Sequence, residues 1–365
     1  MAGSTYGELF RITTWGESHG EALGVVVDGC PAGITIDEDR LNEYMARRKP
    51  GQNKYSTPRK ESDRVKILSG VFDGKTTGTP ISMVTFNENQ RSSDYSEIAS
   101  YYRPGHADYT FDSKYGFRDY RGGGRSSGRE TLARVAAGYI AGCLLNELGI
   151  TVTAYTKSIG PVQIDYDRFN EADIMNSPVY MPDLTASAEA ETYLEDMITK
   201  KDSAGGVVEC VVKGLPAGIG DPVFDKLDAG IAKAVMSIGA VKGVEIGDGF
   251  AVAKTSGSVN NDSFTCEDGN VRKLTNHSGG VLGGISDGSD FIFRAAFKPT
   301  PSIASTQHTV NKSGEDIDIE IKGRHDPVIV PRAVVVVESM AAVTIADMLL
   351  KGMTATIDGV KRFYR

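Results

Sequence analysis

The feature that most constrains the fold is an eight-residue pattern that occurs twice. VDGCPAGI covers residues 27–34, and VKGLPAGI covers residues 212–219. Each copy follows an apolar run typical of a β-strand and precedes an amphipathic pattern typical of a helix. A fainter echo follows in the same order, GVFDGKTTG at 70–78 and GVLGGISDG at 280–288. Two echoes in one order favour a duplicated unit of strand, turn and helix over chance similarity among turns.

The two halves differ mainly in length. The second half contains a polar stretch, residues 256–275, which we expect to form a loop or a hairpin. The acidic segment 165–201 between the halves contains the helical pattern ETYLEDMITKK rather than a flexible linker. We therefore predict an α+β fold with one domain over residues 1–365 and echoed halves at about 1–155 and 200–350.

Composition narrows the class of protein. The formal net charge of −8 argues against general nucleic-acid binding, because the phosphate backbone requires a basic surface. The four cysteines are scattered without CxxC spacing, which favours reduced thiols over a disulfide framework. The N-terminus has no secretory pattern, and the longest unbroken apolar run, residues 333–337, is too short to span a bilayer. We expect a cytoplasmic protein with no membrane contact.

The most informative local segment is RGGGRSSGRETLARVAAGYIAGCLLNELG, which begins at Arg121. Ser127 and Glu130 have capping-box spacing, and apolar residues then recur at helical intervals up to Gly149. A glycine-rich loop that leads into a helix presents backbone N–H groups to an anion. Arginines near this positive helix end are unfavourable unless an anion binds there. We therefore favour an anion site over a purely structural helix; the arginines are Arg121, Arg125, Arg129 and Arg134.

Two of the five histidines have similar surroundings. His19 lies in GESHG and His106 in RPGHADYT, both in glycine-flanked loops rich in charge. A single histidine in a loop is more often structural or exposed, but two of this kind indicate proton transfer near neutral pH. No histidine has a recognisable metal-ligand spacing, so we expect no metal.

Cationic residues recur on other loops rich in glycine, proline or serine. Any one of them is most simply a solvated loop charge. Their recurrence in an acidic protein predicts a partner with several negative charges, and a phosphorylated polycarboxylate fits best. These cations include Arg47, Arg48, Lys54, Arg59, Lys60, Lys298 and Arg324.

Eight segments together resemble the chorismate synthase family, and the similarity runs in unbroken order from the N-terminus to about residue 350. They are GESHG, RRKPG, RPGHADYT, DYRGGGRSSGRETLARVAAG, MSIGAVKGVEIGDGF, NHSGGVLGGISDG, FKPTPSI and GRHDPVIVPRA. The resemblance implies a β-α-β sandwich with pseudo-twofold halves, assembled as a homotetramer. It also implies the anti 1,4-elimination of phosphate from 5-enolpyruvylshikimate 3-phosphate to give chorismate. This is the last common step of the shikimate pathway to the aromatic amino acids, and it depends on reduced FMN.

The resemblance also implies roles for individual residues. His19 would protonate the leaving phosphate, His106 would lie beside the flavin, and Asp326 would assist removal of the C6 proton. Residues similar to flavin contacts are Arg125, Ser126, Ser127, Gly239, Ala240, Gly283, Lys298, Pro299, Thr300, Pro301, Ser302 and Arg324. Residues similar to substrate contacts are Arg48, Arg103, Arg129 and Arg134, and the pair Arg48 and Lys54 is also linked with NADPH.

The chain departs from the family pattern at two positions. Gly239 stands where many relatives carry Asn, so a side-chain contact with the flavin is expected to be lost. Lys54 stands where Arg is common, which keeps the charge but removes a bidentate contact.

Two other classes of function fit part of the pattern. A non-catalytic flavin- or phosphometabolite-binding protein on the same fold is disfavoured, because it has no use for His19, His106 and Asp326 together. A phosphoryl transferase is disfavoured because no GxxxxGK[ST] loop is present. No GxGxxG fingerprint follows a strand, so we expect an enzyme supplied with reduced flavin from elsewhere, with NADPH as a possible reductant.

Overall fold

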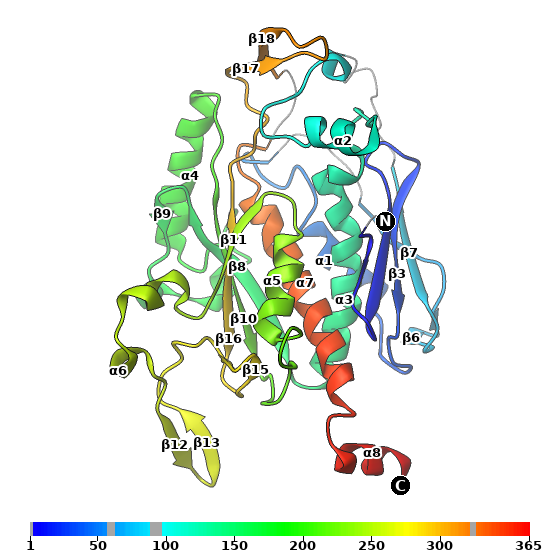
Figure 1. Ribbon diagram of the computed structural model, residues 1–365, viewed down its shortest axis with the longest axis vertical. Coiled ribbons are helices and arrows are strands. Elements are labelled where there is room, and N and C mark those ends of the chain that lie inside the picture. The colour runs from blue at the N-terminus through cyan, green and yellow to red at the C-terminus, as the bar shows by residue number, and fades with distance from the viewer. Residues whose placement is uncertain (1–2, 57–62, 88–96, 322–325) are drawn as a thin grey trace.

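The computed structural model describes residues 3–56, 63–87, 97–321 and 326–365. Two antiparallel five-stranded sheets enclose a layer of helices (Figure 1). The first sheet has the order β1 (Thr5–Tyr6), β2 (Arg11–Gly16), β3 (Ala22–Asp28), β7 (Ile81–Phe86) and β4 (Lys66–Ile67). The second has the order β11 (Val241–Ile246), β16 (Phe291–Phe297), β10 (Gly206–Lys213), β8 (Thr151–Ile159) and β9 (Val162–Gln163).

The central layer contains α3 (Thr131–Glu147) and α7 (Val330–Gly352), which pack against each other. Helix α3 packs mainly on β3 of the first sheet, and α7 packs on β8 and β10 of the second. The two helices approach closely at Gly138, where an added Cβ would lie 2.2 Å from the Cβ of Ser339. The arrangement confirms the predicted β-α-β sandwich.

The internal duplication is visible in the strand order. The series β2-β3-β7-β4 in the first sheet repeats as β8-β10-β16-β11 in the second. A short helix follows the equivalent central strand in each half, α1 (Glu38–Ala46) after β3 and α5 (Leu227–Met236) after β10. Each half also has a small hairpin, β5 (Val71–Phe72) with β6 (Lys75–Thr76), and β14 (Val281–Leu282) with β15 (Ile285–Ser286).

The echoed sequences form the same hydrogen bonds in both halves. Thr76 Oγ1 donates to the Pro31 carbonyl at 2.7 Å and accepts from Ile34 N at 3.0 Å. Ser286 Oγ donates to the Pro216 carbonyl at 2.6 Å and accepts from Ile219 N at 2.9 Å. A buried hydroxyl thus ties each PAGI segment to its hairpin. The predicted duplication is confirmed at the level of individual atoms.

The remaining elements extend from the sandwich. The stretch 256–275 contains α6 (Gly257–Asn260) and a hairpin of β12 (Phe264–Glu267) and β13 (Asn270–Lys273), as expected for it. The helical pattern near residue 195 lies in α4 (Leu184–Thr199). The other elements are α2 (Asp108–Tyr115), the hairpin of β17 (Thr306–Val310) and β18 (Asp316–Glu320), and α8 (Ile357–Tyr364).

Helix α7 is longer and more apolar than the sequence indicated. Among the described residues it is the one helix long and apolar enough to cross a membrane, but 89% of its most apolar window is buried inside the protein. The helix extends beyond the unbroken apolar run at residues 333–337, because Glu338 interrupts the run without ending the helix. Glu338 is paired with Arg47, whose Nη1 lies 2.6 Å from its Oε1. A helix that is apolar on all sides suits the middle layer of a sandwich.

The N-terminal ends of α3 and α7 lie at the same end of the sandwich (Figure 1). Arg48 connects them, because its Nε donates to Thr131 Oγ1 at 3.1 Å and its carbonyl accepts from Arg332 Nε at 3.0 Å. Both helix ends carry partial positive charge. The duplication therefore brings two positive helix ends together beside a buried arginine.

Candidate active site

The glycine-rich loop before α3 differs from the predicted capping box. Two 3₁₀ turns, Gly124–Ser126 and Gly128–Glu130, precede the helix, and Ser127 Oγ accepts from Arg129 N at 3.3 Å. The Glu130 carboxylate does not reach back to Ser127 but accepts from Arg134 Nε at 3.0 Å. A carboxylate binds a charged guanidinium more strongly than a neutral backbone N–H, so Glu130 pairs with Arg134 instead of completing the capping box. The predicted end of the helix is confirmed, with Gly149 at a φ of +71° just beyond it.

His19 packs against the glycine-rich loop. Gly122 has a φ of +62°, and a Cβ added there would lie 2.2 Å from the His19 ring. Ser18 Oγ donates its hydrogen to the Gly122 carbonyl at 3.1 Å, and His19 Nδ1 lies 3.1 Å from Ser18 Oγ. Because a hydroxyl has one hydrogen, His19 Nδ1 must be the donor to Ser18. His19 Nε2 is therefore the nitrogen that accepts or releases a proton.

His106 is a neutral imidazole held in one tautomer. Its Nδ1 lies 3.0 Å from the Pro104 carbonyl, which can only accept, so Nδ1 carries the hydrogen. Its Nε2 consequently accepts from Ser302 Oγ at 2.8 Å. Burial, with a smaller contribution from the nearby Arg103 charge, lowers the pKa of His106 to about 4. His106 therefore presents no positive charge at neutral pH.

The loop that follows β16 lies beside His106, as the resemblance implied. Lys298 Nζ donates to the Gly105 carbonyl at 2.8 Å, and a Cβ added at Gly105 would lie 2.7 Å from Pro301 Cβ. Lys298 N donates to the Ala240 carbonyl at 3.0 Å, which places the Gly239–Ala240 turn against the same loop. Thr300 Oγ1 is buried and has no hydrogen-bond partner within the described part of the chain. This polar cluster comes from three segments far apart in sequence.

The arginines predicted to bind substrate are paired with acidic side chains. Arg48 Nη1 and Arg129 Nη1 bind the two oxygens of Asp63 at 2.7 and 2.8 Å. Arg103 forms a two-point contact with Asp108, through Nε and Nη2, each at 2.8 Å.

The fourth predicted substrate arginine, Arg134, and the predicted flavin contact Arg125 also have internal contacts. Arg134 binds Glu130 and also the side chain and carbonyl of Ser237, next to the Gly239–Ala240 turn. Arg125 binds β2, with Nη2 at 2.6 Å from Thr14 Oγ1.

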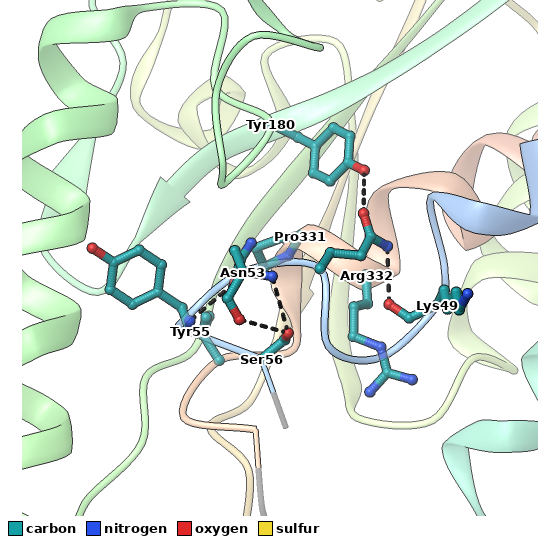
Figure 2. A pocket seen from close by; sticks show the side chains of 9 residues that line it. Lys49, Asn53, Tyr55, Ser56, Tyr180, Pro331 and Arg332 are labelled. Atoms are coloured by element: carbon teal, nitrogen blue, oxygen red, sulfur yellow. Dashed lines mark hydrogen bonds between the residues drawn. The ribbon is translucent and has the colours of Figure 1, made fainter. Parts of the chain in front are cut away.

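Asp326 lies at the start of α7. Its Oδ2 accepts from Arg332 Nη1 at 2.6 Å, so the carboxylate is tied to the first turn of the helix. Arg332 also lines a small cleft between the start of α7 and the loop after α1. Tyr180 and Lys49 also line this cleft (Figure 2); the Tyr180 hydroxyl donates to Gln52 Oε1 at 3.1 Å, and Gln52 Nε2 donates to the Lys49 carbonyl at 2.9 Å. Arg324, a predicted flavin contact, lies outside the described residues.

Two predicted site residues lie apart from this cluster. Gly283 is in the β14–β15 hairpin, which precedes β16, whereas Lys298 follows β16. A strand advances about 3.3 Å per residue, so the length of β16 separates the two. Lys54 is exposed, and its Nζ binds Glu195 on α4 at 2.5 Å. The structure does not bring Gly283 or Lys54 to His19 or His106 within one chain.

The comparisons with known proteins agree with this architecture. The chorismate synthase family model matches residues 10–350. The chain is 68% identical to the chorismate synthase of Lachnoclostridium phytofermentans and 66% identical to that of Agathobacter rectalis, over all of each chain. A crystal structure of chorismate synthase superposes with a TM-score of 0.77 at 31% identity, covering 98% of this chain and 97% of the other. The chain therefore belongs to the chorismate synthase family and is a lyase that forms chorismate on the route to the aromatic amino acids.

Proposed function

We propose that the chain eliminates phosphate from 5-enolpyruvylshikimate 3-phosphate with reduced FMN bound beside His106 and the loop from Lys298 to Ser302. The observation that carries this proposal is the buried hydroxyl of Thr300, which lacks a partner among the described residues although the neighbouring polar groups have theirs. Buried polar atoms are rarely left unpaired, and a ligand or water bound at this loop would supply the partner of the Thr300 hydroxyl. Hydroxyl, imidazole and ammonium groups together suit the polar edge of a flavin. When bound, reduced FMN would lend electron density to the substrate as phosphate leaves.

The proton chemistry is proposed for the chain's own residues. His19 donates from Nε2 to the departing phosphate, since its Nδ1 is held by Ser18. Asp326 assists removal of the C6 proton, and Arg332 fixes the direction of its carboxylate. His106, neutral and held by Pro104, adjusts the polarity beside the flavin rather than supplying a charge. The predicted roles of these residues are retained as proposals.

The negative charges of the substrate are proposed to meet the arginines near the start of α3. Of the two arginines that bind Asp63, Arg129 is the better candidate for direct contact, because its side chain retains 11% exposure whereas that of Arg48 retains 3%. Arg103 and Arg134 would contribute if their carboxylate partners release them on ligand binding. Contact between Arg48 and the substrate would require one of its internal bonds to break.

Other parts of the predicted function are also retained as proposals. The exposed position of Lys54 is compatible with contact to a diffusing reductant such as NADPH. The packing of α3 from one half on α7 from the other supports a single domain over residues 1–365. A homotetramer, a cytoplasmic location and the flavin contacts of Gly283 and Arg324 rest on the family resemblance.

An anaerobic assay tests the cofactor proposal. Phosphate and chorismate release are measured with photoreduced FMN, with oxidised FMN and without flavin. We expect many turnovers per reduced flavin in the first sample and none in the others. Consumption of one reduced flavin per product would contradict the proposed transient role. Binding of flavin and substrate without turnover would support the alternative of a non-catalytic binding protein.

A further inference from the structure

Asp63 is a buried acidic residue with no role in the proposed chemistry. It is 2% exposed, and each carboxylate oxygen binds a different arginine, Arg48 through Oδ2 and Arg129 through Oδ1. Its backbone has a φ of +47°, in the left-handed region that non-glycine residues seldom adopt. Such conformations persist where the surrounding structure determines them and are frequent at functional sites.

The two arginines bound by Asp63 are not equivalent. Arg48 is fixed to the start of α3, because its Nε donates to Thr131 Oγ1 and its Nη2 to the Gly128 carbonyl. Its carbonyl is also held by Arg332 at the start of α7. Arg129 by contrast remains partly exposed, and its Nε donates to Asn87 Oδ1 at 2.7 Å. The carboxylate of Asp63 therefore connects a fixed guanidinium to a more accessible one.

Charge explains why a carboxylate is needed at this position. The guanidiniums of Arg48, which is buried, and Arg129, which is partly exposed, both bind Asp63 near the positive start of α3, where like charges repel more strongly than in water. A single carboxylate between them removes part of this repulsion and also fixes the orientation of both guanidinium groups. A guanidinium that is oriented before the ligand arrives loses less conformational freedom on binding.

We propose that Asp63 is a positioning residue for the anion site, holding Arg129 in the orientation that meets the substrate phosphate. The inference rests on the proposed contact between Arg129 and the substrate. Asp63 contacts neither substrate nor cofactor itself. Its removal should therefore weaken substrate binding through Arg129 while leaving the chemical step nearly unchanged.

The test is a double-mutant cycle of Asp63→Asn and Arg129→Ala. Substrate dissociation constants are measured by calorimetry on the flavin-free protein, and KM and kcat with photoreduced FMN. We expect Asp63→Asn to raise the dissociation constant and KM about tenfold, with kcat changed by less than about twofold, as for a lost charge-assisted contact. The double variant should bind substrate no more weakly than Arg129→Ala alone.

Each other result overturns a specific claim. Additive losses in the double variant, or unchanged binding in Asp63→Asn, would refute the positioning role. Unchanged binding in Arg129→Ala would refute the proposed substrate contact and the inference with it. If Asp63→Asn does not fold, the comparison moves to Arg48→Met with and without Asp63→Asn, since this background removes one of the repelling charges. The same rise in the dissociation constant is expected there, and its absence refutes the inference.

A matched control is Glu338→Gln. Glu338 is also a buried carboxylate, 7% exposed, and binds both terminal nitrogens of Arg47 at 2.6 and 3.0 Å. Among the described residues, Glu338 forms hydrogen bonds with Arg47 and with the backbone N–H of Ala154, and neither is a proposed site residue. We expect Glu338→Gln to lower thermal stability without raising the substrate dissociation constant. An equal rise in both variants would show that loss of any buried ion pair weakens binding, against the inference.

Discussion

The two halves of the sandwich share one strand order but differ at the start of their central helix. Helix α3 follows a loop of glycines and two 3₁₀ turns that carry arginines. Helix α7 follows Asp326, with Pro331 in its first turn and Arg332 beside it. The duplication places the two helix starts at one end, where one half presents cations and the other a carboxylate. An elimination needs both, since one group leaves as an anion while a proton is removed elsewhere.

The opposite end of the sandwich has not diverged in this way. There Thr76 and Ser286 make equivalent bonds to Pro31 and Pro216. The contrast indicates that the shared residues maintain the fold, whereas the differing ones carry the chemistry. Changes at the two ends should accordingly have different consequences.

The largest effect is expected at the diverged end. His19→Ala, in the first half, should lower kcat by about 10²–10⁴-fold, as expected for loss of a general acid. FMN affinity should change far less than kcat, because His19 contacts Ser18 and Gly122, which are not among the predicted flavin contacts. Single-turnover phosphate release, compared with FMN occupancy from its absorbance, provides the measurement. Loss of activity only in proportion to lost FMN would contradict the role of His19.

Asp326→Ala, in the second half, should lower kcat by a similar factor, but by slowing removal of the C6 proton rather than departure of the phosphate. Phosphate departure and proton removal would be distinguished by the isotope effect of C6-deuterated substrate. We expect this effect to be larger in Asp326→Ala than in the wild-type enzyme and not enhanced in His19→Ala. The same isotope effect in both variants would mean that the halves do not divide the reaction as proposed.

The sequence predicted what depends on local patterns. The duplication, the extent of α3 and the hairpin at 256–275 follow from short motifs and periodicity. Asp63 was missed because its partners lie 15 and 66 residues away and its own surroundings carry no motif. The partner of Glu130 was wrongly predicted because a capping box and an ion pair one turn later have the same local signature. Charge balance across distant segments is decided by packing.

A smaller effect, on folding stability at low pH, is expected where the halves meet, at His106 and Ser302. Burial lowers the pKa of His106 to about 4, so the unfolded chain, with a pKa near 6.5, binds the proton more readily. Stability is therefore unaffected above about pH 6.5 and is lost as the pH falls from there to about 4. The loss should reach about 3 kcal/mol at pH 4. Denaturant unfolding of wild type and His106→Asn at pH 7, 5.5 and 4 isolates this contribution.

The outcome for His106 is decided by the difference between the two proteins, because carboxylates also titrate in this range. Wild type should lose more stability on acidification than His106→Asn. Equal losses would show that His106 is as readily protonated in the folded protein as in the unfolded chain. The neutral tautomer assigned from Pro104 and Ser302 would then be wrong.

The smallest effect is expected at the undiverged end. Thr76→Val and Ser286→Ala each remove a buried hydroxyl that donates one hydrogen bond and accepts another. Each change should cost about 1–3 kcal/mol in the free energy of unfolding, because a backbone N–H and a carbonyl lose their partner. The two losses should agree within about 1 kcal/mol if the halves are energetically equivalent. Thr76→Val should leave substrate affinity and kcat unchanged, since β3 separates its hydroxyl from the proposed site. A loss of activity in one variant alone would mean that its hairpin has acquired a role in the site, and the division between a structural end and a chemical end would fail for that half.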